Sequence, residues 1–331
     1  MLFSKLVKRA APSTAKLPAD LSTLKFGQMF SPHMLTVDWT LTGGWEAPQI
    51  GPLEHFSLHP ASSCLHYGVQ CFEGLKAFRG SQDDKIRLFR PDMNIKRFKK
   101  SLDRLCLPND FDETEFLNLM RALVREDQAF VPKGPYYPTG FKPVNLLAEE
   151  KAVRAWVGGT GEAKIGANYA IALGPQTQAQ RQGHSQVLWL FNDQLTEVGT
   201  MNLFVVLGNA KTGEVREICT PALNGTILPG VTRDSVLSLC REWYGNAVVK
   251  ERTITMQEVI KANQNGELVE VTGLGTAALV SPVGKIEYRG EQINIPLLVD
   301  GKMGPVAKRV WNALTDIQYG RSQRLNWTVE V

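Results

Sequence analysis

The sequence predicts an α/β or α+β protein with two domains. The chain has 331 residues, enough for two domains of typical size, and its 43% apolar and 21% charged residues are typical of globular proteins. Strand-like apolar runs and amphipathic helices occur in both halves, on either side of a Pro-, Gly- and Tyr-rich stretch at 131–151 that indicates loop and linker. We expect a small N-terminal domain over 21–145, a linker over 146–160 and a large C-terminal domain over 161–331.

Two helices are predicted in the first half, after a series of short strands that starts near residue 35. The first spans about 93–106 and the second about 112–128. Each has apolar residues at the three- and four-residue spacing of one helix face. These residues are Ile95, Phe98, Leu102 and Leu105 in the first helix, and Phe116, Leu119, Met120 and Leu123 in the second.

The second half predicts buried strands followed by three helices. SQVLWLF (185–191) is a continuous apolar run, which favours a strand covered on both faces. EVGTMNLFVVL (197–207) and EVREICTP (214–221) flank GNAKTG, a hairpin turn. The helices are expected to run from about Arg233 to Tyr244, from a capping box of Thr255 and Glu258, and over about 305–319 before Gly320.

The positive charge of the chain lies at its start. Net charge is +4, and the first 19 residues hold four basic residues and no acid, so the other 312 residues are neutral (4 − 4 = 0). A neutral body gives no electrostatic basis for binding nucleic acid or an anionic membrane, and no apolar run could span a bilayer. The basic start favours a mitochondrial import peptide over 1–20, and the alternative is a disordered tail on a cytoplasmic protein.

The cysteines predict neither a disulfide framework nor a metal site. Cys64, Cys71, Cys106, Cys219 and Cys240 form no C-x-x-C pair, and the chain has no H-E-x-x-H. An odd, scattered set is typical of thiols in a reducing compartment. We expect no metal.

Residues 158–169, GGTGEAKIGANY, place Lys164 among glycines and small residues. Most lysines in such loops point into water. A phosphate-binding loop is a poor match, because Ala163 and Ile165 stand where it needs Gly and Ser or Thr. A lysine can instead form a Schiff base with an aldehyde cofactor such as pyridoxal 5′-phosphate (PLP).

PLP makes three further demands, and the chain offers a candidate for each. Its phosphate needs backbone N–H groups at a helix start or tight turn and a cation, its ring nitrogen a carboxylate, and its ring oxygen a hydrogen-bond donor. The phosphate candidates are Gly230, Val231 and Thr232 at a helix start, Thr276 in a glycine turn and Arg90 at a strand end, with Glu197 for the nitrogen and Tyr169 for the oxygen. Each has an ordinary structural explanation when taken alone.

Seven ordered segments resemble the branched-chain amino acid aminotransferases of eukaryotic type, class IV enzymes with the D-amino-acid aminotransferase-like fold. They are FSPHMLTVDW, LHYGVQCFEGLKAFRG, RLFRPDMNIKRF, RAWVGGTGEAKIGANY, LTEVGTMNLF, ILPGVTR and LTDIQYGR, and the likeness runs from about Phe26 to the C-terminus. It implies a two-domain, PLP-dependent fold of type IV and a homodimer. It also implies amino transfer from L-leucine, L-isoleucine or L-valine to 2-oxoglutarate, giving glutamate.

The resemblance also implies roles for individual residues. Lys164 would carry PLP and shuttle the proton, Glu197 would face the ring nitrogen, and Tyr169 the ring oxygen. Residues implied at the phosphate are Arg90, Val231, Thr232 and Thr276. Residues implied near the substrate are Thr200, Ala277 and the pocket side chains Phe30, Tyr67, Phe72, Lys76 and Tyr136.

The chain departs from the family pattern in two places. After about residue 133 a segment with a Y-x-R-P motif is absent, so an arginine and a tyrosine that help to bind the substrate carboxylate are missing. Either the chain is an impaired splice or gene-model variant that binds PLP or pairs with a full-length subunit, or Lys133 or another basic residue replaces the arginine. Ala278 and Ser281 stand where mammalian relatives have C-x-x-C, so we expect no thiol switch.

Two other reactions on the same fold stay open as alternatives. They are the reactions of aminodeoxychorismate lyase and of D-amino-acid aminotransferase. The aromatic segments and the LTDIQYG ending favour the branched-chain aminotransferases over both.

Overall fold

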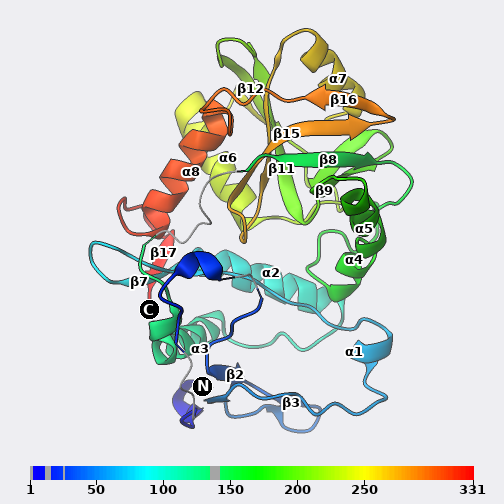
Figure 1. The fold of residues 1–331 in the computed structure, drawn as a ribbon. Helices are drawn as coiled ribbons and strands as arrows, with labels where there is room; N and C mark the ends of the chain where they lie inside the picture. Colours follow the sequence, from blue (N-terminus) through cyan, green and yellow to red (C-terminus); the bar gives the residue numbers. More distant parts are fainter. Residues whose placement is uncertain (1–2, 12–15, 25–26, 135–141) are drawn as a thin grey trace. The chain divides into compact units, whose positions relative to one another are not determined.

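The computed structural model describes residues 1–331 apart from 1–2, 12–15, 25–26 and 135–141 (Figure 1). The chain forms two compact units. Unit 1 consists of Met1–Tyr67, Glu73–Thr139 and Leu314–Val331, and unit 2 of Gly68–Phe72 and Gly140–Ala313. The end of the chain therefore groups with the N-terminal half, whereas the sequence predicted one domain over 161–331. No helix in the described ranges is long and apolar enough to cross a bilayer.

Unit 1 combines short strands with two long helices. Its described elements are η1 (Phe3–Lys5), β1 (Val7–Lys8), η2 (Leu21–Thr23), β2 (His33–Thr36), β3 (Trp39–Thr40), β4 (Gly44–Trp45), β5 (Gln49–Pro52), α1 (Ser63–His66), β6 (Ala77–Arg79), β7 (Ile86–Phe89), α2 (Pro91–Arg104), α3 (Glu113–Glu126), η3 (Gln128–Phe130) and β17 (Thr328–Glu330). The strands form sheets in the orders β1-β5-β2, β17-β7-β6 and β3-β4. Strand β17 ties the end of the chain to β7.

The two helices predicted in the first half are confirmed to within two residues at each end. Helix α2 begins with Pro91, whose missing N–H costs nothing at the first helical position. Helix α3 begins after Asp112, whose side chain accepts a hydrogen bond from the Glu115 N–H at 2.8 Å. Ile95, Leu102 and Leu119 from the predicted apolar faces are buried.

Unit 2 is built on a closed sheet. Its elements are β8 (Val144–Glu149), α4 (Gly166–Ala170), α5 (Leu173–Arg181), β9 (Gln186–Phe191), β10 (Gln194–Val198), β11 (Met201–Gly208), β12 (Val215–Thr220), α6 (Val231–Tyr244), β13 (Val249–Glu251), α7 (Met256–Gln264), β14 (Leu268–Leu274), β15 (Val280–Tyr288) and β16 (Glu291–Asn294); α8 (Pro305–Gln318) starts here and ends in unit 1. Strand order is β10-β9-β8-β15-β14-β11-β12-β13, and β10 also pairs with β11. Six strands thus close a barrel around a core of aliphatic side chains.

The predicted loop at 131–151 and the predicted linker over 146–160 are wrong in part, because Val144–Glu149 is strand β8. It pairs in parallel with both β9 and β15, and Figure 1 shows it beside β15 (orange) despite their distance along the chain. Leu146 is fully buried there. This strand was not predicted because the run is short, follows several prolines and glycines, and pairs with strands that lie far away in the sequence.

The other predicted elements of unit 2 are confirmed, except that the predicted strand over 197–207 is interrupted by a turn at Gly199 and Thr200, so β10 ends at Val198 and β11 begins at Met201. Strand β9 is buried along its middle, and β11 and β12 form the predicted antiparallel pair. Helix α6 ends at Tyr244, and α8 ends just before Gly320, whose φ of 74° suits a helix terminus. Helix α7 starts after Thr255, which accepts a hydrogen bond from the Glu258 N–H at 3.1 Å.

A buried carboxylate on β14 caps helix α8. Glu270 accepts hydrogen bonds from the backbone N–H groups of Val306 (3.1 Å) and Ala307 (2.9 Å). A Cβ at Gly304 would collide with this carboxylate. Burial raises the pKa of Glu270 to about 7, although the two N–H groups act in the opposite direction. Desolvation therefore outweighs the attraction of the helix N-terminus.

The raised pKa of Glu270 predicts a pH-dependent stability. Between pH 4.5 and 7 the unfolded carboxyl ionises while the folded one keeps its proton, so stability falls as pH rises through this window. The shift from 4.5 to about 7 corresponds to about 3 kcal/mol. Glu270→Gln removes this titration. The unfolding free energy of the variant, relative to that of the unsubstituted protein, should therefore increase as pH rises from 4.5 to about 7. Urea unfolding at several pH values measures this difference.

Thr272→Val is the matched control for Glu270→Gln. Among the described residues, the buried hydroxyl of Thr272 has no hydrogen-bond partner, and it does not titrate in this range. Its stability difference from the unsubstituted protein should therefore not vary with pH. An equally constant difference for Glu270→Gln would contradict the prediction.

Candidate functional site

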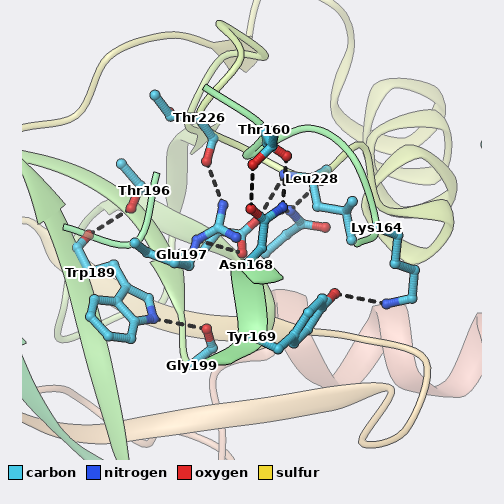
Figure 2. Close-up of polar contacts among 12 residues, drawn as sticks. Thr160, Lys164, Asn168, Tyr169, Trp189, Thr196, Glu197, Gly199, Thr226 and Leu228 are labelled. Carbon is cyan, nitrogen blue, oxygen red and sulfur yellow. Dashed lines mark hydrogen bonds and ion pairs between the residues drawn. The ribbon is translucent and has the colours of Figure 1, made fainter. Parts of the chain in front are cut away.

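Lys164 lies between β8 and α4, with its amine against two aromatic rings. Its Nζ donates a hydrogen bond to the hydroxyl of Tyr169 at 2.9 Å (Figure 2) and lies 4.4 Å from the ring centroid of Phe72. The rings of Phe72 and Tyr169 meet edge to face, with centroids 4.9 Å apart. The amine is thus half-buried and directed, unlike that of a lysine in a solvated turn.

The loop before Lys164 is held by a buried amide. Asn168, on α4, donates from Nδ2 to the carbonyl oxygens of Thr160 (2.7 Å) and Ala163 (2.8 Å), and accepts from the Thr160 hydroxyl at 2.6 Å (Figure 2). A Cβ at Gly161 would lie 2.8 Å from the carbonyl oxygen of Gly225. Gly161 therefore serves close packing, and the loop positions Lys164 firmly.

Glu197, on β10, is a buried carboxylate with defined partners. It accepts a hydrogen bond from the Leu228 N–H at 2.8 Å (Figure 2). Its other oxygen lies 3.4 Å from Nε of Arg154. Arg154 is itself buried and donates to the carbonyl oxygen of Thr226. Asn202 lies 3.4 Å from Glu197 and donates to the Leu228 carbonyl at 2.9 Å.

Burial raises the pKa of Glu197, while the charges of Arg154 and Lys164 and the Leu228 N–H lower it. Desolvation is the largest of these effects. A cation placed beside Glu197 would favour the ionised form further. The carboxylate is therefore suited to a positively charged partner such as a protonated ring nitrogen.

The turn that follows Glu197 is fixed by an indole. Trp189 donates from Nε1 to the carbonyl oxygen of Gly199 at 2.9 Å, and the Thr196 hydroxyl donates to the Trp189 carbonyl at the same distance (Figure 2). Gly199 has a φ of 55°, and a Cβ there would collide with Gln186. Thr200 is consequently exposed at the turn between β10 and β11.

Helix α6 starts beside Glu197 with an uncapped N-terminus. Gly230 is the N-cap residue and has no side chain to bind the N–H groups of the first turn, which includes Val231 and Thr232. A Cβ at Gly230 would collide with Asn202. Such an N-terminus attracts anions.

The loop with Thr276 and Ala277 starts at the end of the sheet where Glu197 lies. It follows Leu274, which pairs with Asn202 on β11. Both loop residues are exposed. Unit 2 therefore brings an amine, a phenol, a buried carboxylate, a helix N-terminus and this loop together.

Comparison with known proteins decides the family. Residues 142–286 match the family described as amino-transferase class IV. The chain is 44% identical to the cytosolic branched-chain-amino-acid aminotransferase of Saccharomyces cerevisiae, over 99% of this chain and 97% of that protein. The chain belongs to the branched-chain-amino-acid aminotransferases. The same family name is carried by a Dictyostelium discoideum protein, 43% identical over 94% of this chain and 91% of its own length.

Solved structures of this aminotransferase family share the fold. A branched-chain amino acid aminotransferase from Thermobaculum terrenum superposes with a TM-score of 0.72 at 20% identity, covering 91% of this chain and 98% of that one. The Escherichia coli enzyme gives a TM-score of 0.67 at 22% identity, with 85% and 95% covered. The predicted type IV fold is thereby confirmed.

Four predicted site residues of this aminotransferase lie in unit 1. Arg90 has a φ of 47° ahead of α2, and its guanidinium lies 4.7 Å from the ring centroid of Trp327. Burial lowers the pKa of Lys76. Phe30 and Tyr67 are exposed in the described chain. The predicted pocket residue Tyr136 lies outside the described residues.

Lys133, considered as a replacement for the missing arginine, has an acidic partner in unit 1. Its Nζ donates to Asp84 at 2.9 Å, and Asp84 also lies 3.7 Å from Arg79. The ion pair satisfies the amine locally. A substrate carboxylate would have to compete with Asp84 for it.

Three residues that hold the site were not predicted from the sequence. Arg154, Asn168 and Asn202 are buried polar residues whose partners are mostly backbone groups. Arg154 and Asn168 stand in the segment RAWVGGTGEAKIGANY, in which only Lys164 and Tyr169 were predicted site residues. For Arg154 the available signal was a charge next to the apolar residues Ala155, Trp156 and Val157.

Proposed function

We propose that this chain is a PLP-dependent transaminase that moves the amino group of L-leucine, L-isoleucine or L-valine to 2-oxoglutarate. Family membership and the Lys164–Tyr169–Glu197 geometry support this proposal. The relatives cover nearly the whole chain and share one name, which gives no support to the alternative of an impaired variant.

The donor set of unit 2 fits PLP. Glu197 offers a buried carboxylate whose pKa is raised chiefly by burial. A further cation beside it, such as a protonated ring nitrogen, would stabilise its ionised form. The uncapped start of α6, at Val231 and Thr232, would receive the phosphate. Tyr169 would donate to the ring oxygen. Arg90 of unit 1 and Thr276 complete the proposed phosphate ligands.

Bound PLP supplies an electron sink that lowers the cost of removing the proton from the substrate's α-carbon. Lys164 would hold the cofactor through Nζ and, once displaced by the substrate's amine, move the proton from the α-carbon. Tyr169, 2.9 Å from Nζ, would orient the amine. Glu197 would keep the ring nitrogen protonated, with Arg154 holding the carboxylate in place.

An apolar pocket would set the specificity for the substrate's side chain. Phe72 contributes a partly exposed ring next to Lys164, and Phe30, Tyr67, Lys76 and Tyr136 are proposed as further walls, with Thr200 and Ala277 near the substrate. Such a pocket discriminates by only about 1–3 kcal/mol per methylene. We therefore expect all three branched substrates to react.

A shortened segment after about residue 133 remains our prediction. The alignment with the cytosolic yeast relative extends over 367 positions, so at least 36 of them (367 − 331) lie opposite no residue of this chain. This difference supports an internal gap.

We also propose a homodimer, as the family resemblance implies. Sedimentation of the purified protein tests this proposal.

We propose a mitochondrial location on the basis of the acid-free, basic start of the chain. Relatives include both cytosolic and mitochondrial proteins. Val7 and Lys8 pair with β5 in unit 1. Fractionation of cells that express the chain with and without residues 1–20 tests the proposal, and an unchanged cytoplasmic location of both would contradict it.

Steady-state assays test the proposed reaction. The purified holoenzyme, given 2-oxoglutarate and each of the three L-amino acids, should form glutamate and the matching 2-oxo acid in equal amounts. D-Amino acids and aminodeoxychorismate serve as probes of the two alternative reactions. Turnover of either in place of L-leucine would overturn the proposal.

A further inference from the structure

Residues 70–72 are hydrogen-bonded to the backbone around Lys164. The Phe72 N–H donates to the Lys164 carbonyl oxygen at 3.0 Å, and the Gly166 N–H donates to the Gln70 carbonyl oxygen at 3.1 Å. Cys71 and Ile165 form an isolated antiparallel bridge. The Phe72 ring also lies under the amine. Any displacement of residues 70–72 would therefore move Lys164.

The next residue, Glu73, is held by Arg97 and Asn94 of helix α2, and we call these three residues the clamp. Arg97 binds its carboxylate with two parallel hydrogen bonds, from Nε at 2.6 Å and from Nη2 at 2.8 Å. Asn94 donates to the same carboxylate at 2.8 Å and to the Gly74 carbonyl oxygen at 3.1 Å. The Arg97 and Glu73 side chains are only 8% and 14% exposed. A bidentate pair of this kind fixes direction as well as distance.

The clamp and the lysine contacts meet at a single peptide bond. The chain passes from unit 2 to unit 1 between Phe72 and Glu73. Consecutive Cα atoms are about 3.8 Å apart, so fixing Glu73 leaves Phe72 little freedom beyond two backbone dihedrals. The peptide that carries Lys164 is thus connected to α2 by one covalent link and a pair of backbone hydrogen bonds.

We infer that Glu73 and Arg97 are positioning residues for Lys164. They act through Phe72, whose N–H and ring hold the lysine's backbone and amine. The inference rests on Lys164 being the residue that holds PLP, as proposed above. A purely structural pair would stabilise unit 1 and leave the lysine unaffected.

Hydrogen exchange and kinetics on the holoenzyme separate these two roles. Arg97→Met, with Arg97→Lys and Glu73→Gln as milder variants, should speed exchange of the Phe72 and Gly166 amides at least about 10-fold under native conditions. The kcat for L-leucine should fall about 10–100-fold, as expected for misplaced reacting groups, with a smaller change in KM. The pH midpoint of the visible band of Lys164-bound PLP should move as well.

Asp127→Asn is the matched control. Asp127 is another buried carboxylate of unit 1, bonded to Nδ1 of His33 at 2.6 Å and to its backbone N–H at 3.1 Å. This variant should destabilise unit 1 without altering the two amides, kcat or the visible band. If the clamp variants behave like Asp127→Asn, the positioning role is refuted. Failure of the proposed function would appear separately, as a lack of PLP on Lys164 in the unsubstituted protein.

Discussion

Replacing Lys164 with alanine is expected to reduce transamination of L-leucine by at least about 10³-fold. A positioned group that transfers protons contributes about 10²–10⁴-fold, and Lys164 would also be the point of covalent attachment of PLP. Its amine has a defined partner, the Tyr169 hydroxyl at 2.9 Å. The measurement is kcat and kcat/KM for the purified variant with 2-oxoglutarate as acceptor.

Lys250→Ala is the control for the lysine substitution. Lys250 is exposed on β13, the strand that follows β12 at the end of the strand order, and it is none of the predicted site residues. Its variant should retain full activity and bind PLP normally. Comparable activity of Lys164→Ala would show that another group performs the proton transfer.

Glu197→Gln is expected to lower kcat by about 10²–10³-fold, a loss similar to that for removing one preorganised electrostatic group. The amide keeps the shape of the side chain but cannot hold a proton on the ring nitrogen. It also leaves Arg154 buried without its anion, 3.4 Å from the former carboxylate oxygen. We therefore expect a stability loss of about 3–5 kcal/mol, as for other broken buried pairs.

A double-mutant cycle separates catalysis from stability at this pair. Arg154→Met alone leaves the buried carboxylate of Glu197 without its positive partner. The unfolding free energy should therefore also fall by about 3–5 kcal/mol. The double variant Arg154→Met/Glu197→Gln contains neither charge, so it should regain most of the stability but none of the activity. Recovery of activity together with stability would mean that Glu197 acts only through the fold.

Elements with local signals were predictable from the sequence. The apolar faces of α2 and α3 and the Thr255–Glu258 capping box depend on residues three or four positions apart, so a short window contains the information. Strand β8 was missed because its signal is not local. Its six residues are stable only between β9 and β15, which are far away in the sequence.

The same distinction applies to the site. Lys164, Tyr169 and Glu197 could be proposed because PLP chemistry demands an amine, a phenol and a carboxylate. Arg154 and Asn168 could not, because their roles depend on carbonyl oxygens that only the folded loops bring near. The clamp of Glu73 by Arg97 spans 24 residues and is visible only once α2 is packed.

The absorption spectrum of the protein with PLP, before and after L-leucine, tests the central claim most directly. We predict a yellow band that borohydride traps on the peptide containing Lys164, and that L-leucine bleaches with release of one equivalent of the 2-oxo acid. Trapping on a different lysine would contradict the assignment of the site. A band on Lys164 that does not respond to L-leucine, L-isoleucine or L-valine would contradict the proposed reaction.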